Sequence, residues 1–187
     1  MGFGAAVFQS AFNREKLYVI PFNTVKTNVG TFVTATQETI EHATLAALAA
    51  DEKLATNITV IDVSDVMAIA EIFVLASAEN ERQVRAIVEE IEDALTKAGQ
   101  EPKRREGNRE NRWVLLDYGM LVIHVQRNTE RDFYGLDRLY RDCPLIEIAG
   151  IETMIRPEEW RDEIDVRTVE SLDDIPLAED LPAEEEF

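Results

Sequence analysis

The sequence has one cysteine, few histidines and no long apolar run. Because Cys143 has no second cysteine to pair with, an intramolecular disulfide is excluded and the chain fits a reducing compartment. The two histidines, His42 and His124, lie far apart in the sequence. No segment reaches the roughly 20 apolar residues of a transmembrane helix. We therefore expect a cytoplasmic protein with no membrane contact, no metal site and no cofactor.

Positive charge is also scarce. The chain holds 37 Asp and Glu against 19 Lys and Arg, which gives a formal net charge of −18. Affinity for nucleic acids comes largely from Lys and Arg that neutralise phosphates, so this composition predicts little direct nucleic-acid binding. A basic protein is the more natural partner for such an acidic chain.

The 187 residues fit one ordinary domain with a segment on either side of it. Residues 1–33 lack helical or strand periodicity, and we expect them to form a poorly ordered, flexible arm. Residues 34–151 carry the periodic segments and form the predicted domain. Residues 152–187 are acidic and have too little apolar surface to offset the entropy of ordering, so they predict a largely disordered tail.

The first half of the domain predicts two helices and two strands. Residues 34–37 have the spacing of a capping box, and a helix is expected to follow as far as about residue 54. The apolar segments 57–63 and 72–76 are interpreted as two central strands. A second helix, capped by Ser77 and ended by Gly99, has apolar residues at helical spacing: Val84, Ile87, Val88, Ile91 and Leu95.

The second half predicts an edge strand, a hairpin and a helix. Residues 102–112 are polar and fit a short edge strand and a loop. The apolar runs 114–116 and 121–125 flank a turn at Gly119. A last helix starts near residue 128 and carries Phe133, Leu136, Leu139 and Tyr140 before Pro144. The order α-β-β-α-β-β-β-α indicates an α/β fold, with a single mixed sheet in one domain.

Polar and aromatic side chains interrupt the apolar hairpin. Trp113, Asp117, Tyr118 and His124 fall where packing alone does not require them, and Tyr134 on the last helix is able to face the same surface. Trp and Tyr supply large, rigid contact area, so we predict that these residues form a protein-binding patch. The alternatives are two core aromatics and a strand histidine with ordinary structural partners.

The order of these motifs resembles the ribosomal silencing factors, also called the RsfS or Iojap family. The resemblance spans about residues 36–147, and its most specific block is the run WVLLDYG at residues 113–119. Further matches are residues 62–64, 73–77, 81–87, 105–107, 122–125 and 133–134, with Leu136 and Leu139. It implies an α/β domain related in shape to nucleotidyltransferases. The resemblance also implies that the domain binds the fourteenth protein of the large ribosomal subunit and prevents joining of the small subunit.

The resemblance bears on residues that are ambiguous by themselves. Glu106 and Gly107 read as an edge-strand turn, but their match to the family favours a contact at the rim of the patch. Arg82 and Arg85 begin the second helix, where a solvated ion pair with Glu89 is the default interpretation and a partner contact the second choice.

Two other functions stay open at this point. A metal-dependent nucleotidyltransferase-like enzyme needs a Gly-Ser turn and carboxylates that bind Mg²⁺; the Gly-Ser turn is missing. Asp62 and Asp65 follow the first strand, and we expect them to cap a turn instead. A homodimeric scaffold would use the hairpin or a strand edge for pairing. We favour a non-catalytic, translation-repressing factor.

Overall fold

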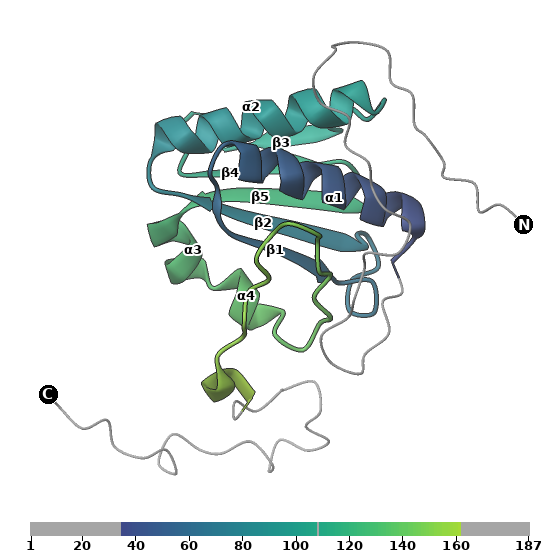
Figure 1. Cartoon of the computed structure of the whole chain (residues 1–187), viewed down its shortest axis with the longest axis vertical. Helices are drawn as coiled ribbons and strands as arrows, with labels where there is room; N and C mark the ends of the chain where they lie inside the picture. The colour runs from purple at the N-terminus through teal and green to yellow at the C-terminus, as the bar shows by residue number, and fades with distance from the viewer. Residues whose placement is uncertain (1–34, 108, 162–187) are drawn as a thin grey trace, which may run out of the picture. The chain divides into compact units, whose positions relative to one another are not determined.

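The computed structural model describes residues 35–107 and 109–161. Its larger compact unit, which ends at Met154, contains one five-stranded sheet in the order β1-β2-β5-β4-β3. The strands are β1 (Thr56–Asp62), β2 (Ile72–Ala78), β3 (Arg104–Glu106), β4 (Trp113–Asp117) and β5 (Leu121–Arg127). β2 and β5 are parallel and all other neighbours are antiparallel (Figure 1). The predicted α/β fold with a mixed sheet is confirmed.

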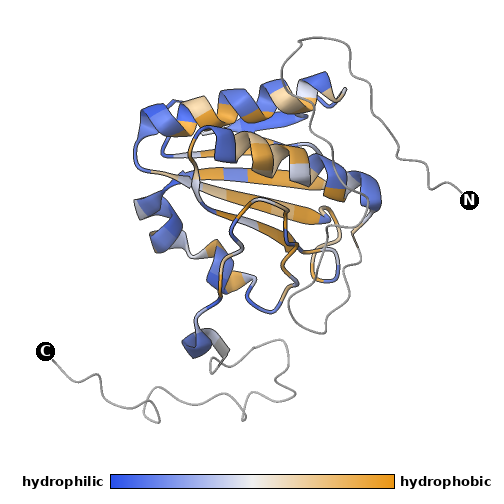
Figure 2. Ribbon diagram, viewed as in Figure 1, coloured by the Kyte–Doolittle hydropathy of each residue, from blue (hydrophilic) through white to orange (hydrophobic). Residues whose placement is uncertain are grey.

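Two helices cover the first face of this sheet. Helix α1 (Gln37–Glu52) packs closely because small residues are fully buried along it: Ala43, Ala46, Ala47, Ala49 and Ala50. Helix α2 (Glu81–Lys97) buries the predicted apolar stripe, and Gly99 follows it with a φ of +84°. Both helices pack against one apolar core whose strands are coloured mostly orange in Figure 2. This face is therefore closed to solvent.

The helix caps differ in detail from the prediction. The side chain of Thr36 accepts a hydrogen bond from the Thr39 backbone N–H at the start of α1. Asn80, not Ser77, caps α2 through a bond from the Gln83 backbone N–H at 2.9 Å. Ser77 is a fully buried residue inside β2. The strand runs two residues further than its apolar run because Ser77 and Ala78 continue the pairing with β5.

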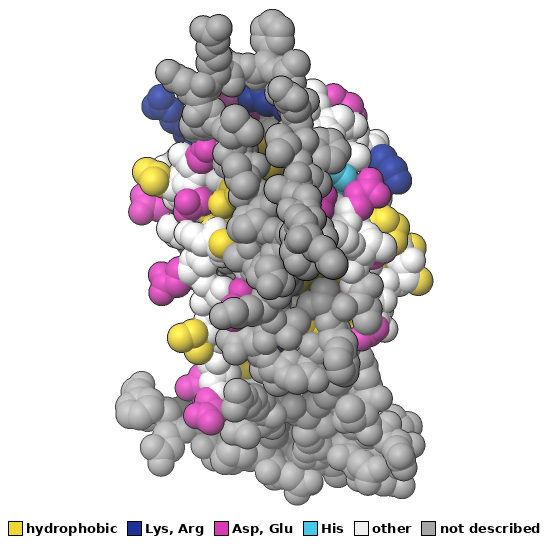
Figure 3. Space-filling view, turned by 45° about the vertical axis from the view of Figure 1, so that its right-hand side comes forward, with side chains coloured by type: hydrophobic (Ala, Val, Ile, Leu, Met, Phe, Trp, Pro, Cys, Tyr) yellow, Lys and Arg dark blue, Asp and Glu magenta, His cyan; other side chains and the backbone are white. Residues whose placement is uncertain are grey.

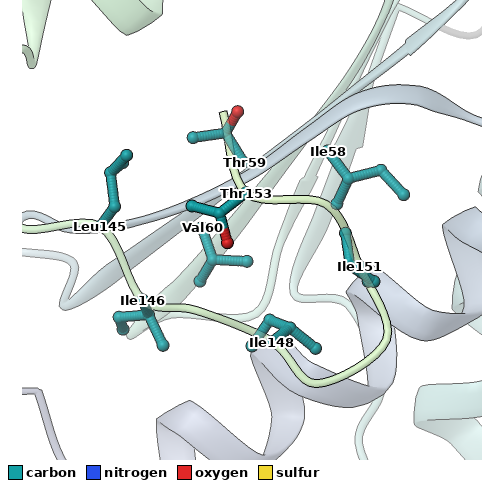
Figure 4. A pocket seen from close by; sticks show the side chains of 8 residues that line it. All are labelled: Ile58, Thr59, Val60, Leu145, Ile146, Ile148, Ile151 and Thr153. Atoms are coloured by element: carbon teal, nitrogen blue, oxygen red, sulfur yellow. The ribbon is translucent and has the colours of Figure 1, made fainter. Parts of the chain in front are cut away.

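β1 is an edge strand, so its interpretation as a central strand was wrong. Its outer edge is partly covered by the chain around Leu145, which forms a bridge to Ile61 and a hydrogen bond from the Ile146 N–H to the Val60 carbonyl. Figure 4 shows Val60, Leu145 and Ile146 among the side chains that surround a cavity of about 10 Å³. That volume holds at most one water molecule, so the cavity is a packing gap in this cover.

The last predicted helix is divided in two. Helix α3 (Asn128–Tyr134) ends at Gly135, whose φ of +54° breaks the helix before α4 (Leu136–Leu139). The sequence pattern missed this corner because apolar spacing continues across it. Together with residues 140–145, this segment supplies Leu136, Tyr140, Cys143 and Leu145 to a smaller apolar cluster on the second face.

Beyond Met154 the structure describes only the start of a second unit, with the short 3-10 helix Glu158–Arg161. The predicted arm at residues 1–33, and the predicted tail from residue 162 onward, lie outside the described residues. Across residues 35–107 and 109–161, no helix has the length and apolar character needed to span a membrane.

Candidate protein-binding surface

Among the described residues, the second face of the sheet is covered over β1 and β2 and left open over β4. Side chains alternate between the faces of a strand. In β4, Val114 and Leu116 are fully buried in the core beneath the helices, whereas Trp113, Leu115 and Asp117 turn to the second face and are half-buried. An apolar strand face that no helix of its own domain closes is a candidate interaction surface.

Aromatic rings extend this open face onto α3. The Trp113 ring centroid lies 5.7 Å from that of His124 and 4.7 Å from that of Tyr134, and Phe133 stacks edge-on against Tyr134 at 5.1 Å. Phe133 is 82% exposed and Tyr134 53% exposed. We call Trp113, Leu115, His124, Phe133 and Tyr134 the aromatic surface. This surface combines a large apolar area with side chains that are mostly held in place by their neighbours.

A buried ion pair attaches α3 to the sheet. The Arg131 guanidinium donates Nε to Asp137 Oδ2 at 2.7 Å and Nη2 to Asp137 Oδ1 at 2.9 Å. It also donates to the Ser77 hydroxyl at 3.3 Å and to the Thr59 hydroxyl at 3.0 Å. Arg131 is 4% exposed, so these bonds form in a nearly dry site. The ion pair therefore fixes where Phe133 and Tyr134 stand relative to Trp113.

His124 forms the floor of the aromatic surface as a neutral ring. Burial, and secondly the nearby positive charge of Arg131, lower the pKa of His124 to about 4. At neutral pH its Nδ1 accepts a hydrogen bond from Trp113 Nε1 at 3.2 Å. Nε2 is buried and has no partner among the described residues. The His124 ring thus orients Trp113, and its role in this surface is structural.

A hollow of about 490 Å³ opens beside the aromatic surface. The β3–β4 loop and α3 line it with Gly107, Arg109, Glu110, Arg112, Trp113, Glu130 and Tyr134. Gly107 has a φ of +84°, and a Cβ atom there would lie 1.9 Å from the Trp113 carbonyl oxygen. Glycine is therefore required where the loop passes over Trp113. The lining mixes two arginines with two glutamates, which suits polar contacts at a rim.

Asp62 and Asp65, the carboxylates considered as metal ligands, lie at the end of β1 and in the turn that follows it. Asp62 Oδ1 accepts bonds from the backbone N–H and the hydroxyl of Ser64, and Oδ2 accepts from the Ala35 N–H. Its predicted role in the turn is confirmed, and Asp65 is exposed nearby. Within residues 35–107 and 109–161, no group of three His, Cys, Asp or Glu residues is placed to hold a metal ion.

The structure separates Tyr118 from Trp113, so the predicted cluster of the two was wrong. Tyr118 packs against the core on the helix-covered face, because five residues along a strand and its turn lead to the opposite side. Burial raises the pKa of its hydroxyl, and the charges of Glu92 and Glu101 raise it further. Asp117 does share the second face, where its Oδ1 accepts from the Gly119 N–H at 2.7 Å and shapes the hairpin turn.

The other predicted residues divide between the two sides. Glu106 is exposed on β3, opposite Leu115, and Gly107 contacts Trp113 directly, so both border the aromatic surface. Arg82 and Arg85 are exposed on α2, the helix that covers the first face. Arg85 pairs with Glu89 at 2.8 Å, as its default interpretation predicted. Sequence reasoning missed Leu115, although its strand alternation with Trp113 was a usable signal.

Comparison with known proteins gives a consistent family match. The family model "Ribosomal silencing factor during starvation" matches residues 36–173. The ribosomal silencing factor RsfS of Halalkalibacterium halodurans is 36% identical over 107 residues, which cover 57% of this chain and 92% of that protein. RsfS of Bacillus subtilis is 38% identical over 104 residues, 56% of this chain and 88% of that protein.

Plant and structural relatives agree with this match. The chloroplast protein Iojap of Zea mays is 32% identical over 112 residues, 59% of this chain and 48% of that protein. A crystal structure from Bacillus halodurans matches 60% of this chain and all of its own, with 33% identity and a TM-score of 0.52. A structure from Chromobacterium violaceum, 24% identical over 67% of this chain and 99% of its own, has a TM-score of 0.55 and shows a shared fold.

The Arg131–Asp137 ion pair gives the first testable prediction. Arg131→Met leaves the Asp137 carboxylate buried without its partner and should lower the free energy of unfolding by about 3–5 kcal/mol. The double variant Arg131→Met/Asp137→Leu should recover much of that loss, because it removes the uncompensated charge as well. Urea unfolding measures both variants. A double variant no more stable than the single one would contradict this account of the corner.

The lowered pKa of His124 gives a second prediction. Below its ordinary pKa of 6.5 the unfolded chain binds a proton that the folded protein does not bind until about pH 4. As the pH is lowered from 6.5 to about 4, the free energy of unfolding should therefore fall by about 1.4 kcal/mol for each pH unit. His124→Gln lacks the titrating group, so it should lose less stability than the wild type as the pH falls. Equal pH profiles for the two proteins would show that His124 is not held neutral by the fold.

Proposed function

Because this chain belongs to the RsfS family of ribosomal silencing factors, we propose that it binds the large ribosomal subunit through its fourteenth protein and represses translation. The bound domain occupies space that the small subunit needs, so the two subunits cannot join. The observation that carries this proposal is the aromatic surface, an exposed patch held in place by a rigid sheet and a buried ion pair.

The chemistry of the aromatic surface suits a protein partner. Aromatic side chains dominate the energy of protein interfaces because they bury much area and lose little rotamer freedom. Phe133 and Tyr134 project from α3 while Trp113 and Leu115 lie lower, on β4. A side chain of the partner can thus contact the α3 rings beside it and the β4 side chains beneath it. Glu106 and Asp117 add negative charge at the edge of this surface.

The acidic body supports a basic partner. Acidic side chains are spread over the face drawn in Figure 3, whereas Lys and Arg side chains are few and lie in its upper part. With a net charge of −18, long-range attraction would accelerate encounter with a cationic protein. Added salt screens such attraction, so it should slow association more than it changes dissociation.

The mechanism requires occupancy and no catalytic step. Large subunits are withdrawn from joining in proportion to the fraction that carries the factor, which rises as the factor exceeds its dissociation constant. The His124 ring, buried and engaged with Trp113, serves this surface as a support. We place this action in the cytoplasm, although two of the relatives are chloroplast proteins.

The aromatic surface gives a third prediction. In Phe133→Ala/Tyr134→Ala the dissociation rate from purified large subunits should rise about tenfold or more, because two anchor side chains are truncated. Leu54→Ala is a matched control, since Leu54 is 78% exposed and follows α1 on the other side of the sheet. Surface plasmon resonance with immobilised large subunits, and with the isolated fourteenth protein, measures both rates. Equal dissociation rates for the double variant and the wild type would show that the aromatic surface is not part of the interface.

A further inference from the structure

The segment that passes along the aromatic surface has the opposite charge to the rest of the chain. Residues 103–112 hold five of the 19 Lys and Arg, with only Glu106 and Glu110 against them. This local excess of positive charge occurs in a chain of net charge −18. We call Arg104, Arg109 and Arg112 the cationic strip.

The strip runs along the edge of the sheet beside the aromatic surface. β3 is the outermost strand, and Arg104 lies opposite Asp117 on the open second face. Arg105, the next residue, turns to the helix-covered face, where it pairs with Glu92 at 2.6 Å. After β3, Arg109 and Arg112 line the hollow together with Trp113 and Tyr134. The cationic strip therefore borders the predicted protein interface directly.

Most of this charge is available to an external anion. Arg104 pairs with Glu106 and Arg112 with Glu110, but all four side chains are largely exposed, and such surface pairs contribute little. Arg109 is exposed and forms no ion pair within the described part of the chain. Contact with a polyanion would release counterions from both partners and so favour binding.

We propose that the cationic strip contacts RNA phosphates of the large subunit next to the protein that the aromatic surface binds. The inference rests on the proposed function, because the aromatic surface brings the strip to the ribosome. A second basic protein would be repelled by the strip, whereas ribosomal RNA is the polyanion that surrounds proteins on that particle. The acidic body still opposes binding to free RNA. The strip acts only after docking, by adding local attraction and fixing orientation.

Binding to purified large subunits at several salt concentrations tests this proposal. Arg109→Gln/Arg112→Gln should bind more weakly than the wild type at 50 mM salt. The difference should shrink about tenfold by 200 mM, since each lost phosphate contact reduces the log–log salt slope by about 0.7–0.9. Lys53→Gln/Lys97→Gln is the matched control. It changes the net charge equally, but both residues lie in the helical layer on the other side of the sheet.

The outcomes separate this inference from the proposed function. Loss of affinity in the strip variant, with a reduced salt slope that the control lacks, supports the RNA contact. Equal affinities and slopes for the two variants would show that the strip faces solvent. Tighter binding of the strip variant than of the control would show that it faces a cationic protein, and either result overturns the inference. A wild-type protein that does not bind large subunits at all would instead defeat the proposed function.

A photoreactive amino acid gives an independent readout. Placed at position 109 in the full chain, it should form adducts with ribosomal RNA after irradiation of the complex. Placed at position 133, it should form adducts with protein. Protein adducts alone at both positions would contradict the RNA contact, while leaving the protein interface intact.

Discussion

The buried pair of Arg131 and Asp137 determines the geometry on which the rest of this surface depends. One guanidinium joins the corner between α3 and α4 to hydroxyl groups of β1 and β2, so a short helix is fixed to a sheet that it covers only in part. Its charge also disfavours a proton on His124, and the neutral ring accepts the Trp113 hydrogen bond. A single buried cation thus positions the α3 rings and also keeps His124 in the form that orients Trp113. Charges so deep are costly unless fully paired, as this one is.

The two faces of the sheet differ in how completely they are covered. On the first face, small residues of α1 and the apolar stripe of α2 close a continuous core. On the second, the smaller cluster ends near Phe73 and Val122, and no helix of the described residues covers β3 and β4 completely. Such exposed apolar area does not stabilise the free protein, and this is the reason to propose that a partner covers it. The cationic strip borders this area, and the proposed RNA contact would add a second kind of interaction on the same side.

Local patterns predicted much of the fold but less of the surface. The spacing of Val84, Ile87 and Ile91 identified α2, and the turn at Gly119 identified the hairpin, because these elements depend on neighbours in sequence. The face that Tyr118 occupies was not predicted, because it depends on whether the alternation of β4 continues past Asp117 into the hairpin turn. The same limitation hid the role of Ser77, which looked like a helix cap and instead binds a guanidinium 54 residues away. Long-range polar contacts of this kind leave no periodic trace.

Occupancy of the large subunit and failure of subunit joining should be the same event. The most direct measurement sediments large and small subunits together with increasing amounts of this protein and quantifies, in each gradient, joined ribosomes and bound factor. The account predicts that joined ribosomes decline as the factor fills the large subunits, and that the factor sediments with free large subunits only. Normal joining with saturated large subunits, or factor carried on joined ribosomes, would contradict it.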